Sequence, residues 1–172
     1  MEYVRTYHSS YVRQDMATRR DLLRWGGLAF GSVLAAGCAK PPAPITTPVN
    51  LQLVGAADMN PDTRGRASPM ALRVYALKTS SGFDTADFFA LFEKDTATLG
   101  GDLIKKEEVL LKPGESHPLA FVLQADAMAL GILAAYRDLS RAQWRQTIPL
   151  VPGQPVNMNA VFGARAITLQ RR

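Results

Sequence analysis

The chain has 172 residues, of which 47% are hydrophobic and 20% are charged, a balance typical of a globular protein rather than of a disordered chain or a coiled coil. The formal net charge is +5, but residues 1–37 hold five arginines and three acidic residues, which leaves +3 on the rest. Because the remaining basic residues are scattered, the charge argues against a nucleic-acid-binding protein. The length allows one domain with a sizeable core.

The first predicted segment is an export signal. A basic stretch, Thr18–Arg24, is followed by the uncharged run Trp25–Gly37. This run is shorter than the roughly 20 residues that span a bilayer, and it has the length of the apolar region of a signal peptide. The pair Arg19-Arg20 also resembles a twin-arginine motif, so the Sec and twin-arginine routes both stay open, as do Met1 and Met16 as the start.

Cys38 is the only cysteine, which excludes an intrachain disulfide and a multi-cysteine metal site. Leu34-Ala35-Ala36-Gly37-Cys38 resembles the bacterial lipobox, although Ala35 stands where Leu is usual. We therefore expect cleavage before Cys38 and a covalent lipid on its sulfur. The alternative is a buried cysteine behind a short helix, which does not explain why the apolar run gives way to the proline-rich segment 39–44.

The expected organisation is an N-terminal extension and lipoprotein signal peptide at 1–37, a lipidated cysteine and Pro-rich tether at 38–48, and a β-sandwich domain at 49–172. Ala39 follows the cysteine, whereas Asp at this position commonly retains Gram-negative lipoproteins at the inner membrane. By that resemblance, the protein is expected at the outer membrane and faces the periplasm. Stable anchoring takes more than one acyl chain.

Short strands are predicted after the tether. Alternating apolar residues predict strands at Val49–Val54 and Met70–Leu77, separated by a long polar loop at 55–69. Further strands are predicted at Glu108–Leu111, Leu119–Leu123, Ala129–Tyr136, Arg145–Leu150, Val156–Val161 and Ala166–Leu169. Ala129–Tyr136 is apolar nearly throughout, which is typical of a central strand covered on both faces. Short strands with Pro-Gly turns predict a mainly β fold, a two-sheet β-sandwich.

One helix is predicted at about Thr85–Leu99, as an insertion between early strands. Asp84 is expected as its N-cap with Asp87 in the first turn, and Gly100-Gly101 is expected to end it. Its predicted apolar side consists of Phe88, Phe89, Leu91, Phe92 and Leu99. Aromatic residues at helical spacing are more typical of a core face than of a cofactor site.

The sequence lacks a recognisable catalytic set. His117 is the only histidine after the predicted cleavage site, and metal-site, GxSxG, SxxK and phosphate-loop spacings are absent. The carboxylate pairs Asp84/Asp87 and Glu107/Glu108 fit a helix cap and a solvated strand edge better than a glycosidase site. We therefore expect no enzyme activity, no metal and no cofactor other than the covalent lipid on Cys38.

The long loop at 55–69 is the remaining candidate for binding, because long ordered loops on a rigid scaffold commonly carry it. Its candidate contact residues are Asp58, Met59, Asn60, Asp62, Arg64 and Arg66. The residues alone leave open whether this is a binding loop or a solvated loop without a partner.

Several motifs in one order resemble the TssJ (SciN, VasD) family of type VI secretion lipoproteins. They are Asn60-Pro61-Asp62, Gly65–Pro69, Leu72–Lys78, Phe83, Asp87–Glu93, Leu99-Gly100, Leu111–Glu115, Leu130–Asp138 and Trp144-Arg145. They cover nearly all of the predicted domain. The resemblance implies a transthyretin-like two-sheet sandwich with one inserted helical element, which agrees with the strand pattern.

The resemblance also implies a function. Members of this family are outer-membrane lipoproteins that bind the periplasmic C-terminal region of the inner-membrane protein TssM, within a membrane complex that has other subunits. The implied TssM contact is the loop between the first two strands, at about Ala56–Pro69. Two other hypotheses stay open: a lipid-anchored periplasmic carrier or chaperone with a sandwich fold, and a periplasmic hydrolase with an unrecognised site.

Overall fold

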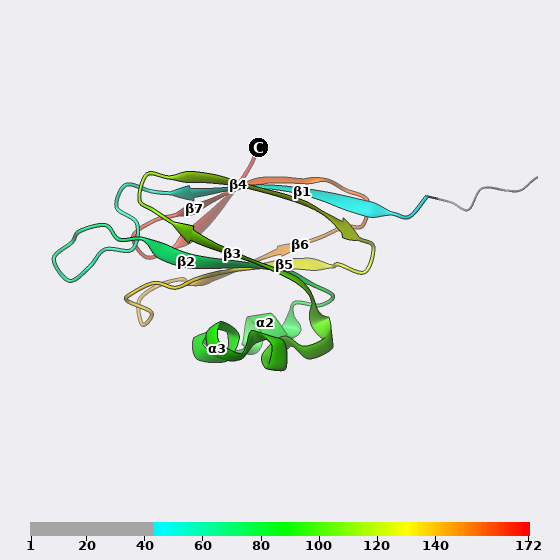
Figure 1. Ribbon diagram of the computed structural model, residues 1–172, viewed down its shortest axis with the longest axis horizontal. Coiled ribbons are helices and arrows are strands. Elements are labelled where there is room, and N and C mark those ends of the chain that lie inside the picture. Colours follow the sequence, from blue (N-terminus) through cyan, green and yellow to red (C-terminus); the bar gives the residue numbers. More distant parts are fainter. Residues whose placement is uncertain (1–42) are drawn as a thin grey trace, which may run out of the picture. The chain divides into compact units, whose positions relative to one another are not determined.

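The computed structural model describes residues 43–172, so the predicted signal peptide and Cys38 lie outside the described residues. The strands are β1 (Thr46–Gly55), β2 (Met70–Leu77), β3 (Leu103–Leu111), β4 (Ser116–Gln124), β5 (Ala129–Ala134), β6 (Arg145–Pro149), β7 (Val156–Phe162) and β8 (Ile167–Arg171). They form two four-stranded sheets, in the orders β4-β1-β7-β8 and β3-β2-β5-β6, which lie face to face (Figure 1). The predicted two-sheet β-sandwich is confirmed.

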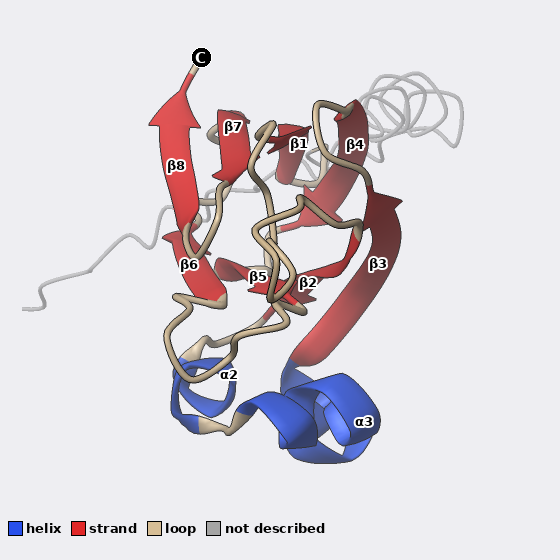
Figure 2. Cartoon of the chain, turned by 90° about the vertical axis from the view of Figure 1, so that its left-hand side faces the viewer, coloured by secondary structure: helices blue, strands red, loops and turns tan. Residues whose placement is uncertain are grey.

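Helices form a third layer on the outer face of the β3-β2-β5-β6 sheet (Figure 2). The insertion between β2 and β3 consists of α2 (Ser81–Thr85), α3 (Phe88–Leu99) and the 3-10 turn η1 (Gly100–Asp102). All six residues of β5 are buried, because one face of the strand meets the other sheet and the opposite face meets the helices. The prediction of a central strand covered on both faces is therefore confirmed.

The core between the sheets is built from alternating strand residues. Val49, Leu51 and Leu53 of β1 point inward and are at most 2% exposed, and they pack with residues such as Leu72 of β2. Alternation of this kind is the period-2 pattern of a strand with one buried face. The sequence pattern therefore located this layer directly.

The edge strand β3 is longer than predicted. It begins at Leu103 rather than at Glu108, and its first half carries Lys105, Lys106 and Glu107. Charged residues give no alternating apolar pattern, but they are common on edge strands because they discourage pairing with another chain. The longer strand pairs with β2 along its whole length, for example Arg73 with Glu108.

The helical insertion differs from its prediction. Two helices replace the single one, and Asp84 lies inside α2, where its Oδ1 accepts a hydrogen bond from Thr147 Oγ1 at 2.6 Å. The N-cap of α3 is Asp87, whose Oδ1 accepts a hydrogen bond from the Ala90 N–H at 2.9 Å. Asp84 as N-cap was therefore wrong, because residues 81–85 are already helical and the chain is extended at Ala86 and Asp87 before α3 begins.

Helix α3 also breaks internally, at Lys94, whose φ of −135° is not helical. Phe89, predicted on its apolar side, is instead 59% exposed. Phe88 and Leu91 are buried as predicted, and the helices pack closely on the sheet. At Gly131 of β5, a Cβ atom would lie 2.9 Å from the Phe83 ring, so the glycine makes room for this packing.

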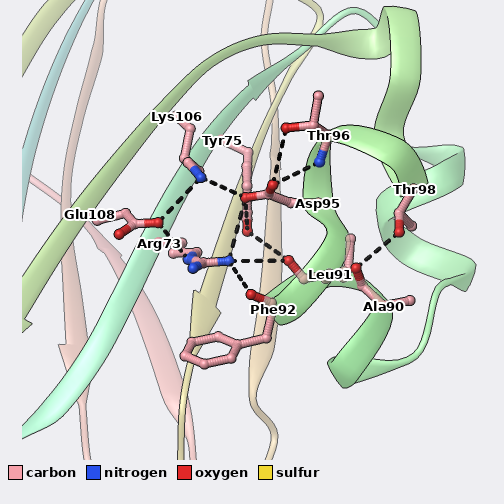
Figure 3. A network of polar contacts seen from close by, with 10 residues as sticks. All are labelled: Arg73, Tyr75, Ala90, Leu91, Phe92, Asp95, Thr96, Thr98, Lys106 and Glu108. Atoms are coloured by element: carbon pink, nitrogen blue, oxygen red, sulfur yellow. Dashed lines mark hydrogen bonds and ion pairs between the residues drawn. The ribbon is translucent and has the colours of Figure 1, made fainter.

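A polar network holds the broken helix on β2 and β3 (Figure 3). Arg73 of β2 donates from Nη1 to the carbonyl oxygens of Leu91 and Phe92, at 3.3 and 2.5 Å. Those carbonyls lie just before the break, so Arg73 supplies donors close to the point where the helix is interrupted. Its Nε pairs with Glu108 at 2.8 Å.

Asp95, 7% exposed, is the acidic centre of this network. Its Oδ2 lies 2.8 Å from Lys106 Nζ, and its Oδ1 accepts a hydrogen bond from the Thr96 N–H at 2.7 Å. Burial by itself would raise the pKa of Asp95, but the hydrogen bonds from Lys106 and Thr96 outweigh burial and hold that pKa below its usual range. The carboxylate is therefore ionised at neutral pH.

Candidate partner-binding site

Four connections gather at one end of the sandwich, which we call the loop end (Figure 1). They are the β1–β2 loop at 56–69, the β3–β4 turn at 112–115, the β5–β6 connection at 135–144 and the β7–β8 turn at 163–166. Backbone hydrogen bonds join neighbouring connections. The Gly55 N–H, at the start of the β1–β2 loop, donates to the Glu115 carbonyl oxygen at 2.9 Å, and the Gln143 N–H donates to the Arg165 carbonyl oxygen at 2.8 Å. The predicted binding loop is thus one part of a larger surface.

Gly55 shows how closely these connections pack. A Cβ atom at this position would lie 2.5 Å from the carbonyl oxygen of Lys112 and 3.2 Å from Met59 Sδ. Only glycine allows this approach without a shift of the backbone. The β1–β2 loop therefore leaves β1 against the neighbouring turn.

Two of the predicted contact residues anchor the loop from inside. Met59 is fully buried in the main core, and Asn60 is 3% exposed. Asn60 adopts a φ of +48°, its Nδ2 donates to the Pro69 carbonyl at 3.1 Å, and its Oδ1 accepts from the Arg137 N–H at 2.8 Å. Asparagine tolerates this left-handed conformation better than most residues. Asn60 thereby joins the start of the loop to its end and to the β5–β6 connection.

Asp62 organises the outer part of the loop. Its Oδ1 accepts hydrogen bonds from the N–H groups of Arg64 and Arg66 at 2.8 and 2.9 Å, and its Oδ2 accepts from Arg66 Nε at 2.8 Å. The Arg66 backbone N–H, followed by the Arg66 guanidinium, holds the pKa of Asp62 below its usual range. The loop is therefore a hydrogen-bonded turn rather than a loose connection.

The remaining predicted residues face solvent. Asp58, Arg64 and Arg66 are all exposed, with the Arg66 side chain 70% exposed. Two charged groups at the tip of a fixed turn, Arg64 and Arg66, are thus available to a partner, and Asp58 precedes the anchor. Of the six predicted residues, these three can make contacts without rearrangement of the loop.

A polar hollow of about 600 Å³ lies between the loop and its neighbours. It is lined by Asn60, Pro61, Asp62, Thr63, Arg137, Asp138, Arg141, Ala164 and Arg165. Arg141 and Arg165 approach Asp138 Oδ2 at 3.8 and 3.7 Å. Of the residues that line the hollow, Asn60 and Asp62 were predicted as contact residues, whereas those of the β5–β6 and β7–β8 connections were missed. Arg137-Asp138 nevertheless belongs to the motifs that carry the family resemblance.

Tyr136 lies next to this hollow in sequence and is 4% exposed. Its hydroxyl group is buried and makes no hydrogen bond within residues 43–172. Burial raises the pKa of Tyr136 well above its usual range, and the negative charge of Asp58 adds to the effect. The phenol is therefore neutral.

Within the described part of the chain, no group of three or more His, Cys, Asp or Glu side chains is placed to hold a metal ion. Across residues 43–172, helices of the length and apolar character needed to cross a bilayer are likewise not found. Cys38, the predicted lipidation site, lies outside the described residues.

The family of type VI secretion lipoproteins, described as "Type VI secretion lipoprotein, VasD, EvfM, TssJ", matches residues 47–170. This span takes in both sheets, the helical insertion and the loop end. The chain belongs to this TssJ family. The family is one of secretion-system lipoproteins rather than of enzymes. No curated protein sequence matches the chain.

Solved structures agree with the TssJ assignment. The crystal structure of the T6SS lipoprotein TssJ1 from Pseudomonas aeruginosa is 38% identical, with a TM-score of 0.69, over 76% of this chain and 98% of that one. A chain of a type VI membrane complex is 27% identical, with a TM-score of 0.63, over 74% and 99%. A chain in a structure described as the T6SS protein TssM C-terminal domain from EAEC is 29% identical, with a TM-score of 0.59, over 71% and 99%.

Proposed function

We propose that this chain is the outer-membrane lipoprotein of a type VI secretion membrane complex, bound through its loop end to the periplasmic C-terminal region of TssM. Membership of the TssJ family supports this proposal, as do similar chains in a type VI membrane complex and in a structure of the TssM C-terminal domain. Anchoring is assigned to a lipid on Cys38, which follows a lipobox-like sequence and precedes Ala39.

The observation that carries the binding proposal is that some residues of the β1–β2 loop anchor it to the fold while others are exposed at its tip. Met59 and Asn60 fix the loop to the core and to the β5–β6 connection, while Asp62 fixes its tip. The tip therefore presents Arg64 and Arg66 in a defined position. A prepositioned charged group loses little conformational entropy on binding, which favours recognition.

Because anchoring and exposed residues are different ones, only a substitution of an exposed residue tests the contact without disturbing the loop. Deletion of residues 58–66 would remove Met59 and Asn60 and would disturb the core along with the contact. Arg66 is also a poor target, because its side chain and backbone bind Asp62. Arg64 contributes only its backbone N–H to the turn, so its exposed side chain can be changed without loss of the loop geometry.

We therefore expect Arg64→Glu to weaken binding to the purified periplasmic region of TssM by about tenfold or more, which corresponds to about 1.4 kcal/mol. Lys78→Glu, the same charge reversal at an exposed site between β2 and α2, serves as the matched control and is expected to bind within about twofold of the unchanged protein. Titration by interferometry or calorimetry measures both. Equal affinity of the two variants would remove the β1–β2 loop from the interface.

A further inference from the structure

Exposed apolar side chains gather at the end of the sandwich opposite the loop end. This tether end consists of residues 43–45, the β4–β5 connection at 125–128 and the β6–β7 connection at 150–155. It displays Ile45, Met128 and Val151, which are 58%, 47% and 54% exposed. Only three other large apolar side chains in residues 43–172 are exposed to this degree, so half of them occupy one small region.

Backbone contacts bring the three segments together. The Leu150 N–H donates to the Met128 carbonyl oxygen at 2.8 Å, and the Gly153 N–H donates to Thr47 Oγ1 at 3.0 Å. A Cβ atom on Gly153 would lie 3.4 Å from Ile45 Cγ2, which places the Ile45 side chain against the 150–155 turn. The exposed apolar residues therefore form one surface rather than scattered sites.

The two ends also differ sharply in charge. The connections of the loop end carry Asp58, Asp62, Arg64, Arg66, Lys112, Glu115, Arg137, Asp138, Arg141 and Arg165. At the tether end, the segments 43–45 and 150–155 carry no charged residue and the segment 125–128 carries only Asp126. Four further charged residues lie at this end beside those segments: Lys78 and Asp102, which are joined through their backbones, and Arg171 and Arg172. A protein end that meets bulk water normally displays charged residues, whereas one that meets a bilayer need not.

Cationic side chains lie next to this apolar surface. Val151 borders a hollow of about 390 Å³ that Pro149 and Pro155 also line, together with Arg171 and Arg172 at the end of the chain. Apolar residues flanked by arginines are suited to an interface of acyl chains and anionic phosphate groups. The arginines would be attracted to anionic phosphate groups but would repel the same arginines on a second copy of the chain, so a phospholipid surface is the favoured occupant.

The length of the tether favours the same occupant. Cys38 lies seven residues before Ile45, so that the intervening chain reaches at most about 25 Å. Strand β1, with its ten residues, is about 33 Å long and leads from the tether end to the loop end. A lipid on Cys38 therefore keeps the tether end near the bilayer and does not allow the molecule to stand with its loop end on the membrane.

We propose that the tether end is a membrane-contacting surface that lies on the phospholipids of the anchoring leaflet, with Ile45, Met128 and Val151 in the interfacial layer and Arg171 and Arg172 at the phosphate groups. The proposal rests on the lipid anchor of the proposed function. It adds a defined orientation, in which the loop end projects away from the membrane.

The single cysteine of the chain makes a direct test possible, since lipidation blocks Cys38 and leaves any introduced cysteine as the only free thiol. The mature lipidated protein carrying Val151→Cys is labelled with a nitroxide and reconstituted in vesicles of phosphatidylethanolamine and phosphatidylglycerol. Electron paramagnetic resonance then measures collisions with oxygen, which concentrates in the bilayer, and with a water-soluble nickel chelate. Arg64→Cys at the loop end is the matched control.

The ratio of oxygen to nickel-chelate collisions is expected to be several-fold higher at Val151 than at Arg64, and Met128→Cys is expected to follow Val151. Equal ratios at Val151 and Arg64 in vesicle-bound protein would overturn the membrane-contacting surface while leaving the anchor intact. A fall in both collision rates at Val151 would indicate a protein cover, such as a second copy, and would also overturn it. Failure of the lipidated protein to float with the vesicles would contradict the anchor itself.

Discussion

Substitution of Asn60 tests the anchoring of the β1–β2 loop most directly. Asn60→Ala removes two hydrogen bonds, one to the Pro69 carbonyl oxygen and one from the Arg137 N–H, in a residue that is 3% exposed. It also places alanine at a φ of +48°. Asn60→Gly removes the same hydrogen bonds but tolerates the backbone conformation, so the pair of variants separates the two contributions.

The expected loss of unfolding free energy follows from the two hydrogen bonds and the backbone conformation. Each buried hydrogen bond contributes about 1 kcal/mol, and the left-handed conformation costs alanine about 1 kcal/mol more. Asn60→Ala is therefore expected to lower the free energy of unfolding by about 3 kcal/mol, and Asn60→Gly by about 2 kcal/mol. Both variants are also expected to bind TssM more weakly, because the tip that carries Arg64 loses its fixed position.

Urea unfolding followed by far-UV circular dichroism measures the stability change. Asn157→Ala is the matched control, since Asn157 is exposed and its Oδ1 accepts only from Asn50 Nδ2, so a change within about 0.5 kcal/mol is expected. If Asn60→Ala unfolds like the unchanged protein, the loop is not held by these hydrogen bonds. If the glycine variant loses as much stability as the alanine variant, the backbone contribution is absent.

Two further predictions concern the helical insertion and the anchor. Asp95→Asn is expected to destabilise the fold by about 2 kcal/mol at pH 7, because Lys106 and Arg73 lose a buried partner but keep Glu108. Since the folded-state pKa of Asp95 lies below its unfolded value, this contribution is present above about pH 4 and is lost as the pH falls through the folded pKa. Urea unfolding across that range should therefore show the difference in free energy of unfolding between Asp95→Asn and the unchanged protein becoming smaller. A difference that stays constant with pH would contradict the ionic account. Cys38→Ser is expected to abolish incorporation of labelled palmitate and to prevent maturation to the lipidated form; continued labelling would exclude Cys38 as the acceptor.

The parts of the fold with a regular apolar pattern could be predicted from sequence. Alternation in β1 and β2, and the continuous apolar run in β5, reflect one buried face and two buried faces respectively. The first half of β3 could not be found this way, because an edge strand displays charged residues. The break of α3 at Lys94 was also missed, because apolar residues at helical spacing continue across it to Leu99 and give no sign of the interruption. Arg73, which donates to the Phe92 carbonyl oxygen just before the break, comes from β2 and is distant in sequence.

The position of the candidate binding loop could be predicted from the sequence, but which of its residues are buried and which are exposed could not. Composition alone does not distinguish a buried Asn60 from an exposed Arg64, because polar residues dominate the whole segment. The distinction depends on what the rest of the fold places beneath the loop. Arg137 and Arg165 were missed for the same reason, since their connections are distant in sequence and meet the loop only through the sandwich.

Strand β1 is central in its sheet, with β4 antiparallel on one side and β7 parallel on the other. The tether enters this strand at one end and the proposed TssM contact leaves it at the other. Tension between the outer membrane and TssM would therefore run along a single strand, parallel to its axis. Because both points of attachment lie on β1, which is already extended, the covalent backbone of this strand carries the pull, and the hydrogen-bonded ladders to β4 and β7 do not have to be sheared. The pairing of the sheet therefore stays unloaded while the two ends of the protein are pulled apart.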